Sequence, residues 1–189
     1  MPYLYSKRLR LRAAEPNDIP HFLDWVNDPE VTENLVLHQP ISSIEEEHWY
    51  ENMLKRPIDE HVMVIEIKKE ASSDSGAISW VAIGNIQFLS INWINRNTEI
   101  GIMIGEKEYW GQGYGTEAMQ LMLTHGFSTL NLHRIWLQVY DKNVRGFKAY
   151  EKAGFVTEGR LREAHYQQGT YNDVIIMSVL KDNWISRKV

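Results

Sequence analysis

Cysteine is missing from all 189 residues of the sequence. Disulfide bonds, thiolate metal sites, iron–sulfur clusters and a cysteine nucleophile are therefore excluded, and a reducing cytoplasm is the expected compartment. Long apolar runs are missing too, because none approaches the roughly 18 to 20 residues of a membrane-spanning helix. Residues 1–10 also lack the apolar core and cleavage site of a signal peptide. We expect a soluble cytoplasmic protein without a membrane partner.

A large excess of charge of either sign is also absent. Lysine and arginine number 20 against 25 aspartate and glutamate, and the net charge of −5 is spread along the chain. Nucleic-acid-binding domains are typically basic on one face, so no nucleic-acid partner is expected. The seven histidines do not show the spacing of a metal-ligand set, and we expect no metal site.

The composition is ordinary for a globular protein, and 189 residues suit a single domain over residues 1–189. Helical apolar spacing predicts about four helices, and alternating spacing predicts about six to seven strands. The predicted helices cover residues 18–27, 43–54, 116–128 and 143–153, and the predicted strands cover 9–13, 62–67, 81–89, 98–104, 133–140, 155–165 and 171–180. This order indicates an α/β fold of the mixed α+β kind, with one central, mostly antiparallel, twisted sheet flanked by the helices.

Residues 109–118, with the sequence YWGQGYGTEA, form the most informative stretch. Gly111, Gly113 and Gly115 stand on alternate positions between an apolar strand pattern and the helical pattern that starts at Thr116. A strand, a glycine loop and a helix N-terminus in succession present backbone N–H groups at the positive end of a helix dipole, which suits a phosphate. The spacing fits neither the dinucleotide fingerprint nor a Walker loop, whose lysine is missing. A structural turn without a ligand is the other interpretation of the glycines.

A second informative stretch, NVRGFKAYEKAGF at residues 143–155, follows the next predicted strand. Asn143 is a natural N-cap for a helix, and Gly154 suits the end of that helix. Phe147 and Tyr150 are three positions apart and share a helical face. Tyr150 is either a core aromatic whose hydroxyl reaches the surface or a functional phenol.

Together, residues 110–118 and 143–155 resemble the GNAT superfamily of acetyl-CoA-dependent N-acetyltransferases. Residues 7–12 and 171–180 also resemble its RimJ/RimL-like branch, so the resemblance covers nearly the whole chain. The implied fold is a single GNAT-like domain whose sheet splays at the cofactor site. Trp110 is a departure, since many members have Arg or Gln there. Because the family's phosphate contacts are mainly backbone N–H groups, we expect cofactor binding to survive this change.

The resemblance implies acetyl-CoA as cosubstrate. It places the pyrophosphate on the glycine loop, and it places the pantetheine arm along a strand, as if an extra strand were added. The cofactor-binding residues implied in this way are Ile102, Met103, Ile104, Trp110, Gly111, Gln112, Gly113, Tyr114, Gly115, Thr116, Asn143, Phe147 and Tyr150.

The resemblance also implies the chemistry. Tyr150 resembles the family's general acid, which protonates the departing CoA thiolate, and Asn143 would contact the pantetheine or an ordered water. A backbone N–H within residues 102–104 would polarise the thioester carbonyl. For the base that deprotonates the amine we select Glu99, acting directly or through water; a strand-edge carboxylate in a salt bridge is the alternative. Without cysteine, direct attack by the amine is simpler than an acyl-enzyme, although a serine route stays open.

The acceptor amine is the least determined feature. The branch resemblance favours a protein N-terminal α-amine, such as that of a ribosomal protein, and a small amine (a polyamine, an amino sugar or an aminoglycoside) is the alternative in the same class. A non-catalytic acyl-CoA sensor is the alternative from another class. We expect residues 31–40, residues 68–76 and the turn at Gln167 to shape the acceptor pocket. Exposed aromatics and the long final strands are compatible with a homodimer.

Overall fold

The computed structural model describes residues 3–35, 37, 39–70 and 78–186, and these contain eight strands and six α-helices. The strands are β1 (Tyr3–Tyr5), β2 (Leu9–Ala13), β3 (Met63–Glu70), β4 (Ile78–Asn92), β5 (Asn97–Ile104), β6 (Arg134–Tyr140), β7 (Val156–Gln167) and β8 (Thr170–Leu180). The α-helices are α1 (Ile19–Val26), α2 (Pro29–Thr32), α3 (Ser43–Leu54), α4 (Tyr114–Ser128), α5 (Val144–Ala153) and α6 (Lys181–Ser186). Short 3-10 turns, η1 (Pro16–Asp18), η2 (Ile58–Glu60) and η3 (Lys107–Tyr109), precede α1, β3 and the glycine loop.

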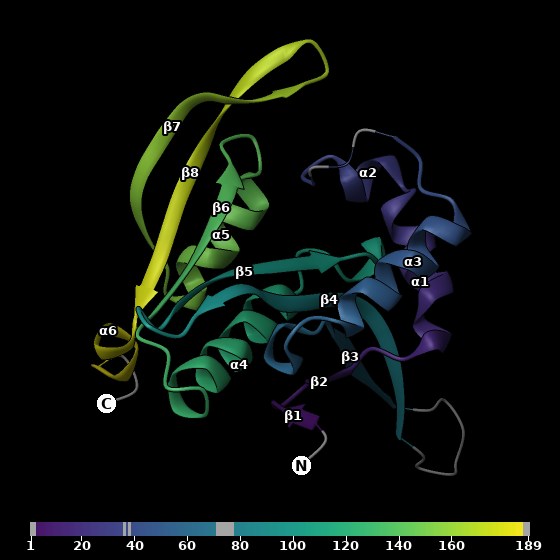
Figure 1. Cartoon of the computed structure of the whole chain (residues 1–189), viewed down its shortest axis with the longest axis horizontal. Coiled ribbons are helices and arrows are strands. Elements are labelled where there is room, and N and C mark those ends of the chain that lie inside the picture. The colour runs from purple at the N-terminus through teal and green to yellow at the C-terminus, as the bar shows by residue number, and fades with distance from the viewer. Residues whose placement is uncertain (1–2, 36, 38, 71–77, 187–189) are drawn as a thin grey trace.

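All eight strands form one sheet in the order β1-β2-β3-β4-β5-β6-β8-β7 (Figure 1). Each neighbouring pair is antiparallel except β5 and β6, which are parallel and joined through α4. The predicted mixed, mostly antiparallel sheet is therefore confirmed. The additional elements β1, α2 and α6 have three, four and six residues, which is too short to establish an apolar period.

The sheet separates two apolar clusters. The larger one packs α4 against the sheet, and the smaller one packs α1 and α3 against the opposite face. Strand β3 contributes side chains to both clusters, because Ile65 and Ile67 belong to the larger cluster and Val64 belongs to the smaller. Alternate side chains of a strand point to opposite faces, so a strand covered on both faces is apolar at nearly every position.

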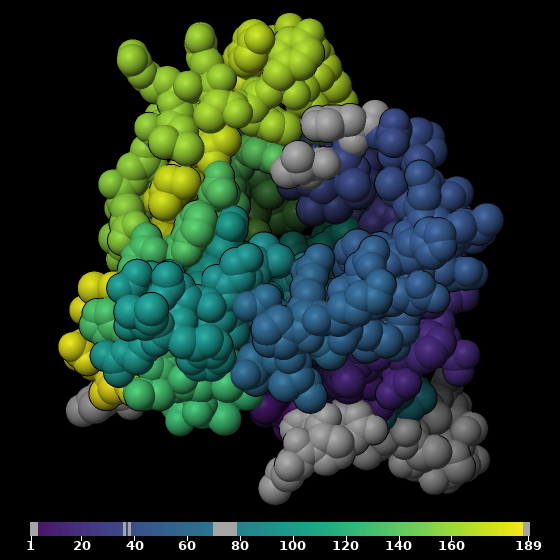
Figure 2. Space-filling view, viewed as in Figure 1, coloured from purple at the N-terminus to yellow at the C-terminus, as the bar shows by residue number. Residues whose placement is uncertain are grey.

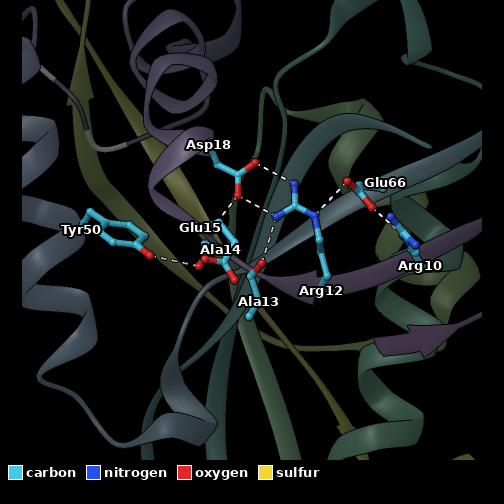
Figure 3. A network of polar contacts seen from close by, with 8 residues as sticks. All are labelled: Arg10, Arg12, Ala13, Ala14, Glu15, Asp18, Tyr50 and Glu66. Atoms are coloured by element: carbon cyan, nitrogen blue, oxygen red, sulfur yellow. Dashed lines mark hydrogen bonds and ion pairs between the residues drawn. The ribbon is translucent and has the colours of Figure 1, made fainter. Parts of the chain in front are cut away.

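A buried polar network fixes the start of α1 relative to the sheet (Figure 3). The guanidinium of Arg12 donates to both carboxylate oxygens of Asp18, at 2.6 and 2.7 Å, and its Nε lies 2.8 Å from Glu66 on β3. Arg10 donates to the other oxygen of Glu66. Burial alone would raise the pKa of Asp18, but the hydrogen bonds from Arg12 and from the Glu15 backbone hold it below its usual range. Each carboxylate in the network thus has a cationic partner.

The parallel pairing of β5 and β6 is short. It runs from Asn97 opposite Arg134 to Glu99 opposite Trp136, and within these two fully described strands it extends no further. Beyond Glu99 the two strands diverge, as Figure 1 shows. The edge of β5 that faces β6 is therefore without a strand partner from residue 100 to Ile104. The splayed sheet that the resemblance implies is present.

Candidate active site

The glycine loop leads directly into the N-terminus of α4. Gly111 has a φ of +74° and Gly113 a φ of +83°, a left-handed conformation that strains residues with a side chain. Gly113 is the N-cap, so α4 begins at Tyr114, two residues earlier than the apolar pattern predicts. The first N–H groups of a helix have no partner inside the helix, and those of Tyr114, Gly115 and Thr116 are the ones available to a ligand.

Arg8 fixes the loop from outside. Its guanidinium donates to the Gln112 carbonyl at 3.1 Å and to the Glu117 carboxylate at 2.7 Å, and it lies 4.4 Å above the Tyr114 ring centre. The Gln112 side chain donates to the Glu108 carbonyl at 2.7 Å. Gln112 therefore shapes the loop, and it does not line the adjacent cavity.

A cavity of about 310 Å³ lies between the unpaired part of β5, the glycine loop and α5. Every cofactor-binding residue predicted from the resemblance lines it, except Gln112 and Phe147. Phe147 packs against the larger apolar cluster instead. The cavity thus joins two segments of sequence, the loop and α5, that were expected to act together.

Tyr150 lies on α5 and faces this cavity. Its ring packs against the larger apolar cluster, with the Phe155 ring centre 6.2 Å away. Burial raises the pKa of the Tyr150 phenol to about 12, and the charge of Arg145 opposes that rise. Its hydroxyl has no hydrogen bond to the described part of the chain. At neutral pH Tyr150 is consequently a protonated phenol that is able to donate to a ligand.

Asn143 begins α5. Its side-chain oxygen accepts a hydrogen bond from the Gly146 N–H at 2.8 Å, as expected of an N-cap. A Cβ at Gly146 would lie 2.6 Å from the Asn143 amide nitrogen, so a glycine is needed for this close packing. The oxygen of Asn143 is thereby committed to the helix, and its amide nitrogen is the group left for a ligand.

Glu99 lies outside the cavity lining, at the last paired position before β5 and β6 diverge. Thr98 and Ile100 are buried, so alternation places Glu99 on the opposite face of the strand. Burial raises the pKa of Glu99, and a weak hydrogen bond from Gln138 at 3.4 Å opposes the rise. No salt bridge involves Glu99 within the described residues, which removes the ion-pair interpretation there.

A row of cations on α5 was not anticipated. Arg145, Lys148 and Lys152 all line the cavity, across from the glycine loop. Arg145 stacks on the Trp110 ring, with its guanidinium carbon 3.6 Å from the ring centre. The spacing of the three residues, at positions i, i+3 and i+7, is the sequence signal that would have placed them on one helical face.

A second cavity of about 340 Å³ adjoins the first and shares Asn34, Trp110, Asn143 and Arg145 with it. It lies between α2 and the β7–β8 turn, where Figure 2 shows a recess in the surface. Glu33 is part of its wall, and the Gln167 side chain donates to the Glu33 carbonyl at 2.8 Å across 134 positions of sequence.

The predicted pocket segments contribute unequally. Val31, Asn34 and Leu35 line the main cavity, and Gln167 lines the second. That these segments shape the acceptor pocket stays a prediction. Residues 71–77, most of the predicted serine-rich segment, lie outside the described residues.

The sequence profile of the Acetyltransferase (GNAT) domain matches residues 8–156. The chain belongs to this family. Spermidine N(1)-acetyltransferase of Vibrio cholerae is 29% identical over 183 residues, which cover 96% of this chain and 98% of the relative. The putative ribosomal N-acetyltransferase YdaF of Bacillus subtilis is 32% identical over 105 residues, covering 56% of this chain and 57% of the relative.

A solved structure of the Vibrio cholerae spermidine N-acetyltransferase with CoA and spermine has a TM-score of 0.81 at 29% identity. It covers 94% of this GNAT chain and 98% of the other. This protein is therefore an acetyl-CoA-dependent N-acetyltransferase. Among the described residues, no cluster of His, Asp and Glu could hold a metal ion, and no helix is long and apolar enough to cross a membrane.

Proposed function

We propose that this N-acetyltransferase transfers the acetyl group to a primary amine of a polyamine. The similarity to spermidine acetyltransferases extends over nearly the full length of both chains, whereas the similarity to the putative ribosomal enzyme covers about half. These similarities support the small-amine alternative better than the protein N-terminus that the branch resemblance favoured. Glu30 and Glu33 line the cavity beside the cofactor site. The Glu30 carboxylate is ion-paired with Lys107, so Glu33 is the carboxylate that suits a cationic acceptor.

The observation that carries the mechanism is the opening between β5 and β6, with Tyr150 in its wall. Acetyl-CoA supplies the activated acetyl group, and the free edge of β5 offers backbone groups to the pantetheine arm and the thioester carbonyl. The neutral amine attacks the carbonyl carbon and forms the C–N bond. The attacking nitrogen is then positively charged and loses its second proton to water as the amide forms. As the C–S bond breaks, Tyr150 gives its proton to the departing thiolate, and the phenolate regains a proton from water.

The amine arrives as an ammonium ion and must lose a proton before it attacks. Glu99 is our candidate for the base, because it stands where the strands diverge and burial raises its pKa toward neutrality. Since it does not line the cofactor cavity, it would act through a water molecule. The proton of the ammonium ion leaves by this route, and the overall reaction releases one proton.

A panel of amines tests the proposal. Purified enzyme and acetyl-CoA would be incubated with spermidine, spermine, glucosamine, kanamycin or a peptide with a free N-terminus, and released CoA thiol would be measured. We expect the largest kcat/KM with the polyamines. Acetylation of peptides alone would overturn the polyamine proposal in favour of the protein N-terminus. Tight CoA binding without thiol release from any amine would instead favour a non-catalytic sensor.

A further inference from the structure

Arg145 differs from the arginines that are paired with carboxylates elsewhere in the chain. Arginines with such a partner are Arg8, Arg10, Arg12, Arg134 and Arg160. Within the described residues, the guanidinium of Arg145 makes no hydrogen bond and no ion pair. Its guanidinium carbon lies 3.6 Å from the centre of the Trp110 ring, and the negative charge of Glu33 acts on it without forming an ion pair. It is a cation in the wall of the cofactor cavity with its hydrogen-bonding capacity unused.

The geometry holds this guanidinium at the beginning of the glycine loop. Trp110 immediately precedes Gly111, and its indole N–H donates to the Ile104 carbonyl at 2.8 Å, which fixes the ring. Arg145 reaches the ring from the first turn of α5, two residues after the N-cap Asn143. The contact therefore connects the two walls of the cavity.

Stacking leaves the guanidinium edge free. An arginine that packs its flat face on an aromatic ring still presents its N–H donors in the plane, where they match two oxygens of a phosphate. Burial lowers the pKa of Arg145, yet an arginine remains charged at neutral pH. Trp110 has no charge with which to bind a phosphate. Arg145 on α5 places a positive charge beside the Trp110 ring.

We propose that Arg145 binds the pyrophosphate of CoA from the α5 side, opposite the backbone N–H groups of the glycine loop, and that Trp110 is the platform that holds it there. Arg145 is a positioning residue in this assignment, because it binds the donor away from the reacting thioester. The inference rests on the established use of acetyl-CoA and is independent of which amine is acetylated.

Binding of donor analogues to the full chain tests the assignment without an acceptor. CoA and dephospho-CoA both carry the pyrophosphate, and pantetheine carries none. In calorimetric titrations, we expect Arg145→Gln to weaken CoA and dephospho-CoA alike, by about tenfold or more, since a charge-assisted hydrogen bond contributes roughly 1.5–3 kcal/mol. Pantetheine affinity should not change, and Arg145→Lys should recover part of the loss. Arg56→Gln, an exposed arginine on the surface after α3, is the matched control and should have no effect.

Three results would overturn the proposal. One is unchanged affinity of Arg145→Gln for both nucleotides. Another is a loss confined to CoA, because that would assign Arg145 to the 3′-phosphate. The third is an equal loss with pantetheine, which would show a general distortion of the cavity.

A double-mutant cycle tests the role of Trp110. If Trp110 holds the guanidinium in place, Arg145→Gln should cost less affinity in a Trp110→Leu background than in the wild type. Strictly additive losses would contradict the platform. In steady-state kinetics, Arg145→Gln should raise the KM for acetyl-CoA about tenfold, by the same hydrogen-bond magnitude, while kcat stays within about twofold. A fall in kcat with unchanged CoA affinity would assign Arg145 to Tyr150 instead, and would also overturn the proposal.

Discussion

Arg12 and Arg145 carry the same side chain in opposite circumstances. Arg12 is held by Asp18 and Glu66 within the network of Figure 3, so its donors are used inside the protein. Arg145 stacks on Trp110 in a cavity wall and has no acceptor within the described residues. Removing a cation that is paired with buried carboxylates leaves those carboxylates without a partner and destabilises the fold. An unpaired cation beside a helix N-terminus is available to an anionic ligand. The structural role of Arg12 and the ligand-binding role of Arg145 differ in whether the guanidinium N–H donors already have acceptors within the protein.

The two walls of the cofactor cavity differ in a related way. The loop wall offers backbone N–H groups at residues 114–116, whereas the α5 wall offers side chains, among them Asn143, Arg145 and Tyr150. Substitutions at different positions should therefore change CoA binding, catalytic rate and folding stability separately.

Tyr150→Phe should have the largest effect. Loss of the general acid should lower kcat by about 10² to 10⁴, because a positioned proton donor typically contributes that much. CoA affinity should stay the same, since the ring remains. Steady-state kinetics and calorimetry measure the two quantities. Full turnover by the variant would show that water or another residue protonates the thiolate.

Arg12→Leu should destabilise the fold by roughly 3–5 kcal/mol, because it leaves the buried Asp18 and Glu66 carboxylates without that partner. Urea unfolding measures the loss, and Arg145→Gln is the matched control that should change stability by less than about 0.5 kcal/mol. A similar loss in both variants would remove the distinction between the two arginines.

The same network predicts a pH dependence of stability. The pKa of Asp18 is lowered in the folded state, so its contribution is present above the unfolded value of about 3.9 and is lost as the pH falls through the folded value. Urea titrations below about pH 4 should show a steeper loss in the wild type than in Arg12→Leu. Parallel curves for the two proteins would count against this role of Asp18.

Gly113→Ala should cost about 1–2 kcal/mol, because its φ of +83° is unfavourable for an L-residue with a Cβ. The displaced loop should also weaken CoA binding. Gly159→Ala is the control, since a Cβ at that position in β7 meets no atom within 4 Å. Thermal unfolding and CoA titration should show a lower stability and a weaker CoA affinity for Gly113→Ala and no change for Gly159→Ala. Equal results for the two variants would show that the loop tolerates a side chain.

Glu99→Gln should have the smallest effect on rate, about tenfold in kcat/KM, because a water molecule would relay the proton. The raised pKa of Glu99 places the acidic limb of the wild-type pH–rate profile above the pKa of an ordinary glutamate. As the pH falls through that value, Glu99 becomes protonated and the rate falls. The variant should lose this limb, and an unchanged profile would make Glu99 structural.

Local signals explain what the sequence predicted correctly. Alternating apolar residues marked most strands, and Asn143 and Gly154 bounded α5 as predicted. The start of α4 was misplaced because the left-handed Gly113, rather than the first apolar residue, is its N-cap.

Long-range contacts explain the rest. Arg145 meets Trp110 only after the chain has folded, and the contact of Gln167 with Glu33 joins segments 134 residues apart. The spacing of apolar residues along the sequence does not reveal contacts between distant segments. The second cavity, which such contacts form, could therefore not be predicted from the sequence pattern. The homodimer stays a prediction.

A structure determined with CoA and spermidine bound would test the account most directly. The decisive quantity is the distance between the CoA sulfur and the Tyr150 hydroxyl. We predict that the sulfur lies in the opening between β5 and β6, within hydrogen-bond reach of that hydroxyl at about 3 Å or through one water. The amine should approach from the face that carries Glu99. A sulfur placed away from Tyr150, with the amine bound elsewhere, would contradict the proposed mechanism.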